Sequence, residues 1–188
     1  MSKIIDNPLL VGATGTFAGV FVYRRVRGNV VMAKRPTRTK PQTETQIVTQ
    51  TAFQKAARYA KFQIRKPEVK EVYAEGITSK KHSAFLVAVS DALRSPEISP
   101  LDLKRYTGAV GDAILIEAHD DFRVTAVSVE IQDPNGITIE RGAASAIPEL
   151  FDTWTYTITV LNATPVGSKL IVTATDFANN NTIEEFIK

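Results

Sequence analysis

The chain has 188 residues, of which 44% are hydrophobic and 23% charged, a balance typical of a soluble globular protein with one domain or two small ones. The absence of cysteine excludes disulfides, thiolate zinc sites and cysteine nucleophiles, and two histidines make imidazole sites scarce. The net charge of +3 hides an asymmetry that indicates two modules, because residues 1–108 hold 19 Lys/Arg against 8 Asp/Glu and residues 109–188 hold 4 against 12.

Residues 9–19, LLVGATGTFAG, are similar to the start of a dinucleotide-binding chain, where glycines let amides at a helix N-terminus close around a pyrophosphate. Those motifs need glycine at position 18, where this chain has Ala18, and no acidic residue lies between Asp6 and Glu44. Lys34 and Arg35 could suit a 2′-phosphate instead, so a nicotinamide-nucleotide-binding enzyme is kept as a third hypothesis. The preferred interpretation is that the glycines let the chain pack closely against a neighbour.

The apolar stretch from Leu9 to Val22 is too short to span a bilayer, so no membrane span is expected. Asp6 and Pro8 interrupt its start and no small-residue cleavage site follows, so it makes a poor signal peptide. We therefore expect a protein that is cytoplasmic or incorporated in a bacterial or phage-type assembly. The export route, if there is one, stays open.

β-branched and aromatic residues on both sides of Arg27-Gly28-Asn29 predict a β-hairpin, which residues 36–46 (PTRTKPQTETQ) continue as an extended arm. Basic residues of the hairpin, arm and following helix are expected to contact a partner: Arg24, Arg25, Arg27, Lys34, Arg35, Arg38, Lys40, Lys55, Arg58, Lys61 and Arg65. That partner is either an acidic protein surface, such as the acidic half of a neighbouring copy, or the phosphates of a nucleic acid. The hairpin, arm and helix start resemble small uncharacterised bacterial proteins of phage-like or prophage-like gene clusters, a resemblance that implies no activity.

Capping and breaking signals predict a helical segment after the arm. Thr43 and Gln46 form a capping box, and the apolar stripe that follows consists of Phe53, Ala57, Ala60 and Ile64. The Lys66-Pro67 step ends this helix, a second one is predicted from Pro67 to Ala74 before Gly76, and residues 83–93 form a third helix or a strand. The chain thus divides into a hairpin with its basic arm (1–41), a helical segment (42–95), a linker (96–108) and an all-β module (109–188).

From about Ala109 the hydrophobic period changes from 3.6 to 2, which predicts short strands separated by turns at 133–136, 164–167 and 179–181. The segments GDAILIEAHDDFRVTAVSVEIQDPNG, WTYTITV and LIVTATDFANNNT resemble bacterial immunoglobulin-like domains. The resemblance covers residues 109–188 and implies an antiparallel β-sandwich that serves as a binding or spacing unit, without catalysis. We expect this module to fold alone with Trp154 buried.

Four aspartates are expected near strand ends, where calcium could bridge carboxylates: Asp120, Asp121, Asp133 and Asp176. No dense calcium-loop motif is present, so solvated turn residues are favoured and calcium binding by these four stays open. His119 next to Asp120 does not make a histidine-rich metal site, and His82 beside Ser83 does not make a triad. We therefore expect no catalytic residue, no metal and no cofactor.

These patterns predict an α+β protein, in which an N-terminal β-hairpin, extended arm and helices precede an all-β antiparallel immunoglobulin-like sandwich. The preferred function is a non-enzymatic structural or assembly protein. In this hypothesis the basic half anchors it to neighbouring subunits in a homo-oligomer or larger assembly, and the acidic module is displayed or stacked. The alternative is a sequence-independent nucleic-acid-binding or packaging protein that uses the basic half.

Overall fold

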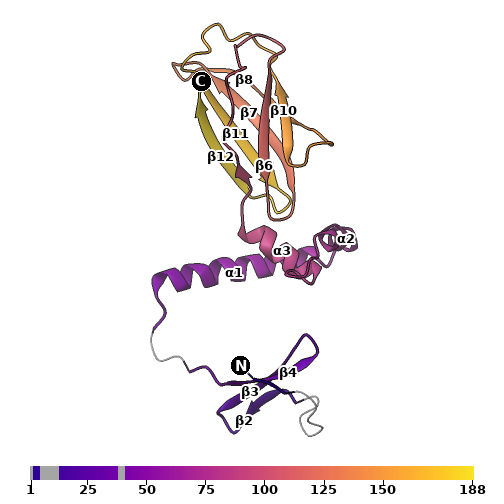
Figure 1. Cartoon of the computed structure of the whole chain (residues 1–188). Coiled ribbons are helices and arrows are strands. Elements are labelled where there is room, and N and C mark those ends of the chain that lie inside the picture. Colours follow the sequence, from indigo (N-terminus) through magenta and orange to yellow (C-terminus); the bar gives the residue numbers. More distant parts are fainter. Residues whose placement is uncertain (1, 5–12, 38–40) are drawn as a thin grey trace. The chain divides into compact units, whose positions relative to one another are not determined.

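The structure is a computed structural model that describes residues 2–4, 13–37 and 41–188. Within these residues it contains three helices and three antiparallel sheets, which confirms a mixed α+β fold (Figure 1). The chain forms two compact units, Met1–Gln46 and Ile47–Lys188.

The first unit contains one antiparallel sheet with the strand order β1-β4-β3-β2. Its strands are β1 (Ser2–Ile4), β2 (Gly15–Phe17), β3 (Phe21–Val26) and β4 (Asn29–Lys34). The predicted hairpin is β3 and β4, and Arg27 and Gly28 both have positive φ in the turn, as a tight hairpin turn requires. Part of the predicted arm, residues 38–40, lies outside the described residues.

The glycine-rich stretch leads into strands. Gly15 begins β2, and Ala18 and Gly19 adopt positive φ in the turn to β3. In residues 13–37 no helix follows the glycines, so the helix N-terminus that a dinucleotide site needs does not form there. Residues 9–12, the start of the glycine-rich stretch, lie outside the described residues.

Three helices follow, and each begins or ends at a signal that the sequence carries. Helix α1 (Glu44–Gln63) starts with a reciprocal capping box, in which the Gln46 amide donates to Thr43 Oγ1 and the Thr43 amide donates to Gln46 Oε1. Helix α2 (Pro67–Glu75) ends at Gly76. Segment 83–93 is helix α3 (Ala84–Leu93), capped by Ser83 Oγ, which accepts a hydrogen bond from the Leu86 amide.

The buried face of α1 differs from the predicted stripe. Ala56 and Ala60 are buried among α2 and α3, whereas Phe53 is 52% exposed. Small side chains let the helices approach closely near the C-terminal end of α1, and the described residues provide no comparable cover for its earlier turns. The predicted stripe is therefore confirmed at Ala60 and, as partly buried residues packed on the same cluster, at Ala57 and Ile64, and it is wrong at Phe53.

The remaining strands of the second unit form two four-stranded antiparallel sheets. One is ordered β5 (Glu97–Ile98), β6 (Ala113–His119), β10 (Thr153–Thr157), β9 (Ser145–Ala146). The other is ordered β12 (Asn181–Ile187), β11 (Lys169–Asp176), β7 (Val124–Gln132), β8 (Thr138–Ala143). Alternate residues of β6, β7 and β11 are buried, and the buried side chains of both sheets belong to one hydrophobic core.

Two details of this core differ from the sequence pattern. Segment 96–108, predicted to be a linker, supplies strand β5 and the buried side chains of Leu103 and Tyr106. Trp154 is only partly buried, because it packs against the core but also lines a surface cavity of about 320 Å³ beside Pro148 and Phe151.

Glu130 on β7 is expected to stabilise this unit only above acidic pH. Gln132, Thr138 and Arg141 donate hydrogen bonds to its carboxylate and hold its pKa at about 2, below the ordinary 4.5. Because the unfolded chain takes up this proton first, the contribution is present above pH 4.5 and is lost as pH falls from about 4.5 to about 2.

Glu130→Gln should therefore lower the free energy of unfolding at neutral pH by about 0.5–1 kcal/mol, the range of a partly exposed ion pair. Urea titrations of the wild type and the variant at several pH values measure this difference. It should shrink towards zero as the pH approaches about 2. A difference that stays constant with pH would contradict the role of the ionised carboxylate.

Candidate functional site

The helical segment packs on one end of the two-sheet module through aromatic rings. Tyr73 of α2 is fully buried, and its ring centroid lies 5.0 Å from that of Phe122 and 5.2 Å from that of Phe177. Phe122 follows β6 and Phe177 follows β11, so two turns of the module meet the helices here. At Gly76 a β-carbon would lie 2.7 Å from the Phe122 ring, and the helix end therefore needs glycine for this approach.

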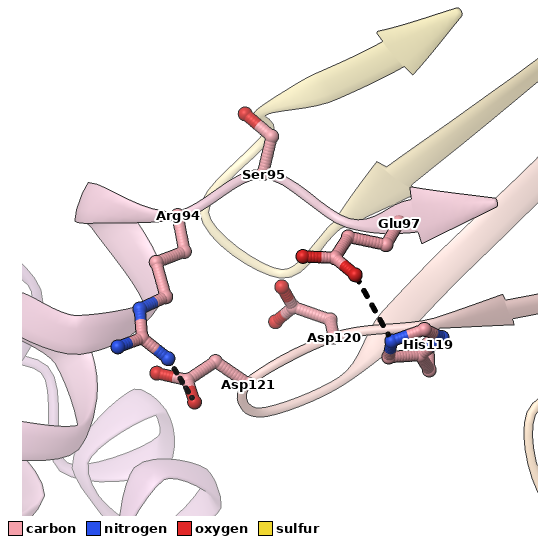
Figure 2. A pocket seen from close by; sticks show the side chains of 6 residues that line it. All are labelled: Arg94, Ser95, Glu97, His119, Asp120 and Asp121. Carbon is pink, nitrogen blue, oxygen red and sulfur yellow. Dashed lines mark hydrogen bonds and ion pairs between the residues drawn. The ribbon is translucent and has the colours of Figure 1, made fainter. Parts of the chain in front are cut away.

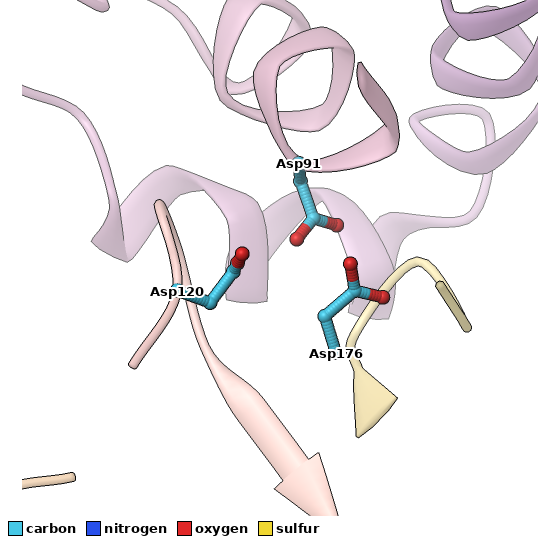
Figure 3. Close-up of side chains that lie close together, drawn as sticks. All are labelled: Asp91, Asp120 and Asp176. Atoms are coloured by element: carbon cyan, nitrogen blue, oxygen red, sulfur yellow. The ribbon is translucent and has the colours of Figure 1, made fainter. Parts of the chain in front are cut away.

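Three carboxylates meet at this junction. Asp91 lies on α3, Asp120 follows β6 and Asp176 ends β11, and one oxygen of each lies within 4.8 Å of the others. Figure 3 shows the three side chains turned towards one another from these three elements. Asp91 is 0% and Asp176 1% exposed, and Asp120 is partly buried.

Each of the three carboxylates accepts at least one hydrogen bond, on one oxygen in Asp91 and Asp120 and on both oxygens in Asp176. The Tyr73 hydroxyl donates to Asp91 Oδ2 at 2.6 Å, and the Phe122 amide donates to Asp120 Oδ2 at 2.9 Å. Asp176 accepts from the Asn180 amide and from Asn180 Nδ2, both at 2.7 Å. Asp91 Oδ1 and Asp120 Oδ1 are buried and accept no hydrogen bond.

Burial makes these groups hard to ionise together. It raises the pKa of Asp91 to about 7, against the hydrogen bond from Tyr73 and with the charges of Asp176 and Asp120 adding to the rise. Burial also raises the pKa of Asp176, although the hydrogen bonds from Asn180 oppose the shift. The cluster therefore brings three acidic groups together without a lysine or arginine of the described residues in ion-pair distance, which disfavours the ionised form of at least one of them.

The basic side chains nearest to the three carboxylates form ion pairs with Asp121 instead. Lys81 Nζ lies 2.9 Å from Asp121 Oδ2 and Arg94 Nη1 lies 3.1 Å from Asp121 Oδ1. Burial acts to raise the pKa of Asp121, but hydrogen bonds from Ser90 and Lys81 and the two positive charges outweigh it and lower that pKa. Asp121 is thus a conventional ion-pair residue, distinct from the adjacent Asp120.

An open cavity of about 480 Å³ lies beside the cluster, and Asp120 lines it. Figure 2 shows two pairs across it, Arg94 with Asp121 and His119 with Glu97, whose Nε2 and Oε2 atoms are 3.3 Å apart. The remaining lining residues are Ser95 and Asp120, so the cavity combines three carboxylates with a histidine, an arginine and a serine hydroxyl.

The predicted basic contact residues occupy several surfaces. Arg24 and Arg25 are adjacent on β3 and so lie on opposite faces of the first sheet, while Arg27, Lys34 and Arg35 are exposed at its turn and strand end. Arg38 and Lys40 lie outside the described residues.

On the helical segment the structure brings only some of the predicted basic residues together. Lys55, Arg58, Lys61 and Arg65 are all exposed. Arg58 and Lys61 line a shallow cavity of about 280 Å³ with Phe53 on α1.

Of the four aspartates considered for calcium, the structure brings together Asp120 and Asp176. Asp133 instead organises its own turn by accepting hydrogen bonds from the Asn135 and Ile137 amides. The sequence analysis missed Asp91 and Tyr73. The available signal was the single carboxylate within the apolar helix AFLVAVSDAL, since a lone aspartate there must find a polar partner.

No protein-family model, curated protein or solved structure matches the chain. Within the described residues, none of the helices combines the length and apolar character needed to cross a bilayer.

Proposed function

We propose that the protein is a non-enzymatic assembly protein, whose first sheet docks on further copies of the same chain while an immunoglobulin-like module is displayed. The two-sheet core of residues 96–188 supports such a module, because two antiparallel sheets pack their alternating apolar faces together. Modules of this architecture commonly bind or space other proteins.

The observation that carries this proposal is the exposed apolar surface of the first sheet. Phe17 and Phe21 are cross-strand partners on one face and are 63% and 38% exposed, and the Phe17 ring packs edge-on against Tyr23. Within residues 13–37, only Val30 and Val31 of this sheet are buried, and they lie on opposite faces. Covering the exposed apolar side chains of this sheet would stabilise it, and another subunit can provide that cover.

Charge complementarity favours a second copy as that partner. Residues 1–108 carry an excess of positive charge and residues 109–188 an excess of negative charge, so the basic half of one chain matches the acidic half of another. The exposed Arg25 on the face of Phe21 and Tyr23 could pair with carboxylates of that copy. Strand β2 at the sheet edge offers a further means of association by strand pairing.

Light scattering of the full chain at micromolar concentration tests this proposal. We expect the wild type to exceed the mass of one chain and Phe17→Ser/Phe21→Ser to approach it. A phenylalanine side chain that becomes buried between two subunits contributes about 1.5–3 kcal/mol to the free energy of association. Losing two of them should therefore weaken association by more than tenfold. Ile137→Ser is the matched control, since Ile137 is 65% exposed in a turn of the other unit. A monomeric wild type, or equal dissociation of the control variant, would contradict the proposal.

Nucleic-acid binding is the second candidate, favoured by the exposed basic residues of the hairpin and α1. Arg25→Lys/Arg35→Lys separates the two functions, because bidentate carboxylate pairing needs arginine whereas phosphate neutralisation needs only charge. We expect the double variant to weaken self-association. Tight DNA binding that falls steeply with salt and tolerates both substitutions would favour the second candidate instead.

A further inference from the structure

We propose that Asp91, Asp120 and Asp176 bind one Ca²⁺ ion at the junction between the helical segment and the two-sheet module. This site goes beyond the assembly role and depends on none of the residues of the first sheet. One oxygen from each carboxylate lies within 4.8 Å of the others, a spacing that a single ion can bridge.

The first argument is electrostatic. Three carboxylates lie together where two are almost fully buried, and in the described part of the chain no lysine or arginine lies within ion-pair distance of them. Buried negative charge without a partner is strongly unfavourable. A proton on one carboxyl would leave two charges facing each other, whereas a divalent cation offsets two charges and attracts all three groups.

The second argument concerns unsatisfied oxygens. Asp91 is 0% exposed and its Oδ1 accepts no hydrogen bond, and Asp120 Oδ1 is also buried without a donor. A buried acceptor left without a partner costs about 1–3 kcal/mol, so native proteins almost always satisfy it. The other oxygens of Asp91 and Asp120 accept from Tyr73 and the Phe122 amide, so the Oδ1 atoms are the ones left to bind an ion.

The choice of Ca²⁺ follows from the donor set. All the donors are oxygens from three separate elements, an irregular arrangement that Ca²⁺ accepts with 6–8 ligands whereas Mg²⁺ requires near-ideal octahedral geometry. Water can supply the remaining ligands, because Asp120 also lines the open cavity of about 480 Å³. The bound ion would tie α3 to the turns that follow β6 and β11.

Calorimetric titration of Ca²⁺ into the chelator-treated full chain tests the site. We expect one ion per chain and at least tenfold weaker binding in Asp120→Asn, which keeps the shape of the side chain and an acceptor for the Phe122 amide. Asp133→Asn is the matched control, because Asp133 also lies in a turn between strands and accepts amide hydrogen bonds there. This control should bind as the wild type does.

Terbium luminescence detects the bound ion directly. If these aspartates only stabilised the fold, no such signal would arise. Tyr73 donates to Asp91, so a Tb³⁺ ion in the site lies close enough to be excited through that ring, and added Ca²⁺ should quench the signal by displacement. The absence of binding up to about 10 mM Ca²⁺, above the range of weak protein sites, overturns the proposal. Equal loss of binding in Asp133→Asn overturns it as well, since the ion would then lie elsewhere.

Discussion

Tyr73→Ala is expected to lower the free energy of unfolding of the Ile47–Lys188 unit by about 3–5 kcal/mol, the cost of removing a large buried aromatic side chain. Tyr73 has no exposed surface, and its ring packs against both Phe122 and Phe177. The substitution leaves a cavity where α2 meets two turns of the two-sheet module, so both parts lose contacts. Chemical denaturation followed by the fluorescence of Trp154, the single tryptophan, measures the change.

Tyr73→Phe separates the ring from its hydroxyl. This variant keeps the aromatic contacts but removes the donor to Asp91 Oδ2 and the hydroxyl contact with Tyr59 at 3.0 Å. We expect a smaller loss of about 1–3 kcal/mol, because Asp91 is left buried with a further unsatisfied oxygen. Equal losses in the two variants would show that the hydroxyl, and not the ring packing, holds the junction together.

Features encoded by adjacent residues could be predicted from the sequence. The hairpin follows from Gly28, which tolerates the positive φ of its turn, and α1 follows from the reciprocal capping of Thr43 and Gln46. The strands of the second unit follow from alternation, since β6 and β11 bury every second residue. In each case a few neighbouring residues determine the local conformation, and no distant contact needs to be known.

Features that depend on distant contacts could not be predicted. Asp91, Asp120 and Asp176 are far apart in the sequence, and their meeting depends on how α3 packs against two turns. The sequence predicts that Asp120, Asp121 and Asp176 all lie near strand ends and does not distinguish between them. In the structure Asp121 forms ion pairs with Lys81 and Arg94 and is not part of the cluster. Adjacent aspartates point in different directions, and only the fold determines which one faces the cluster.

The contribution of segment 96–108 to the hydrophobic core also could not be predicted from the sequence. Its prolines are typical of a linker, but Pro96 is fully buried, β5 pairs with β6, and Leu103 and Tyr106 belong to the hydrophobic core. Hydrogen bonds fix it in place, since Asn162 Nδ2 donates to the Tyr106 hydroxyl and Lys188 Nζ donates to the Leu103 carbonyl. Prolines in a sequence indicate an irregular backbone, but they do not indicate whether the segment is buried.

A fragment of residues 96–188 is therefore expected to melt cooperatively, while a fragment of residues 109–188 is expected to lose most of its stability. Removing a buried leucine side chain costs about 2–5 kcal/mol and removing a buried aromatic ring about 3–5 kcal/mol. The loss of Leu103 and Tyr106 together is thus comparable to the whole stability of a typical domain, about 5–15 kcal/mol. Thermal melts of both fragments by circular dichroism measure the difference.

Both fragments lack the helical segment, so its removal affects them equally and the comparison isolates residues 96–108. Leu103→Ala in the longer fragment is the matched variant, and it should lower the melting temperature without abolishing the transition, because Tyr106 and β5 remain. If residues 109–188 melt as cooperatively and at the same temperature as residues 96–188, segment 96–108 contributes nothing to the core. The two-sheet module would then begin at Ala109, as the sequence pattern alone predicts.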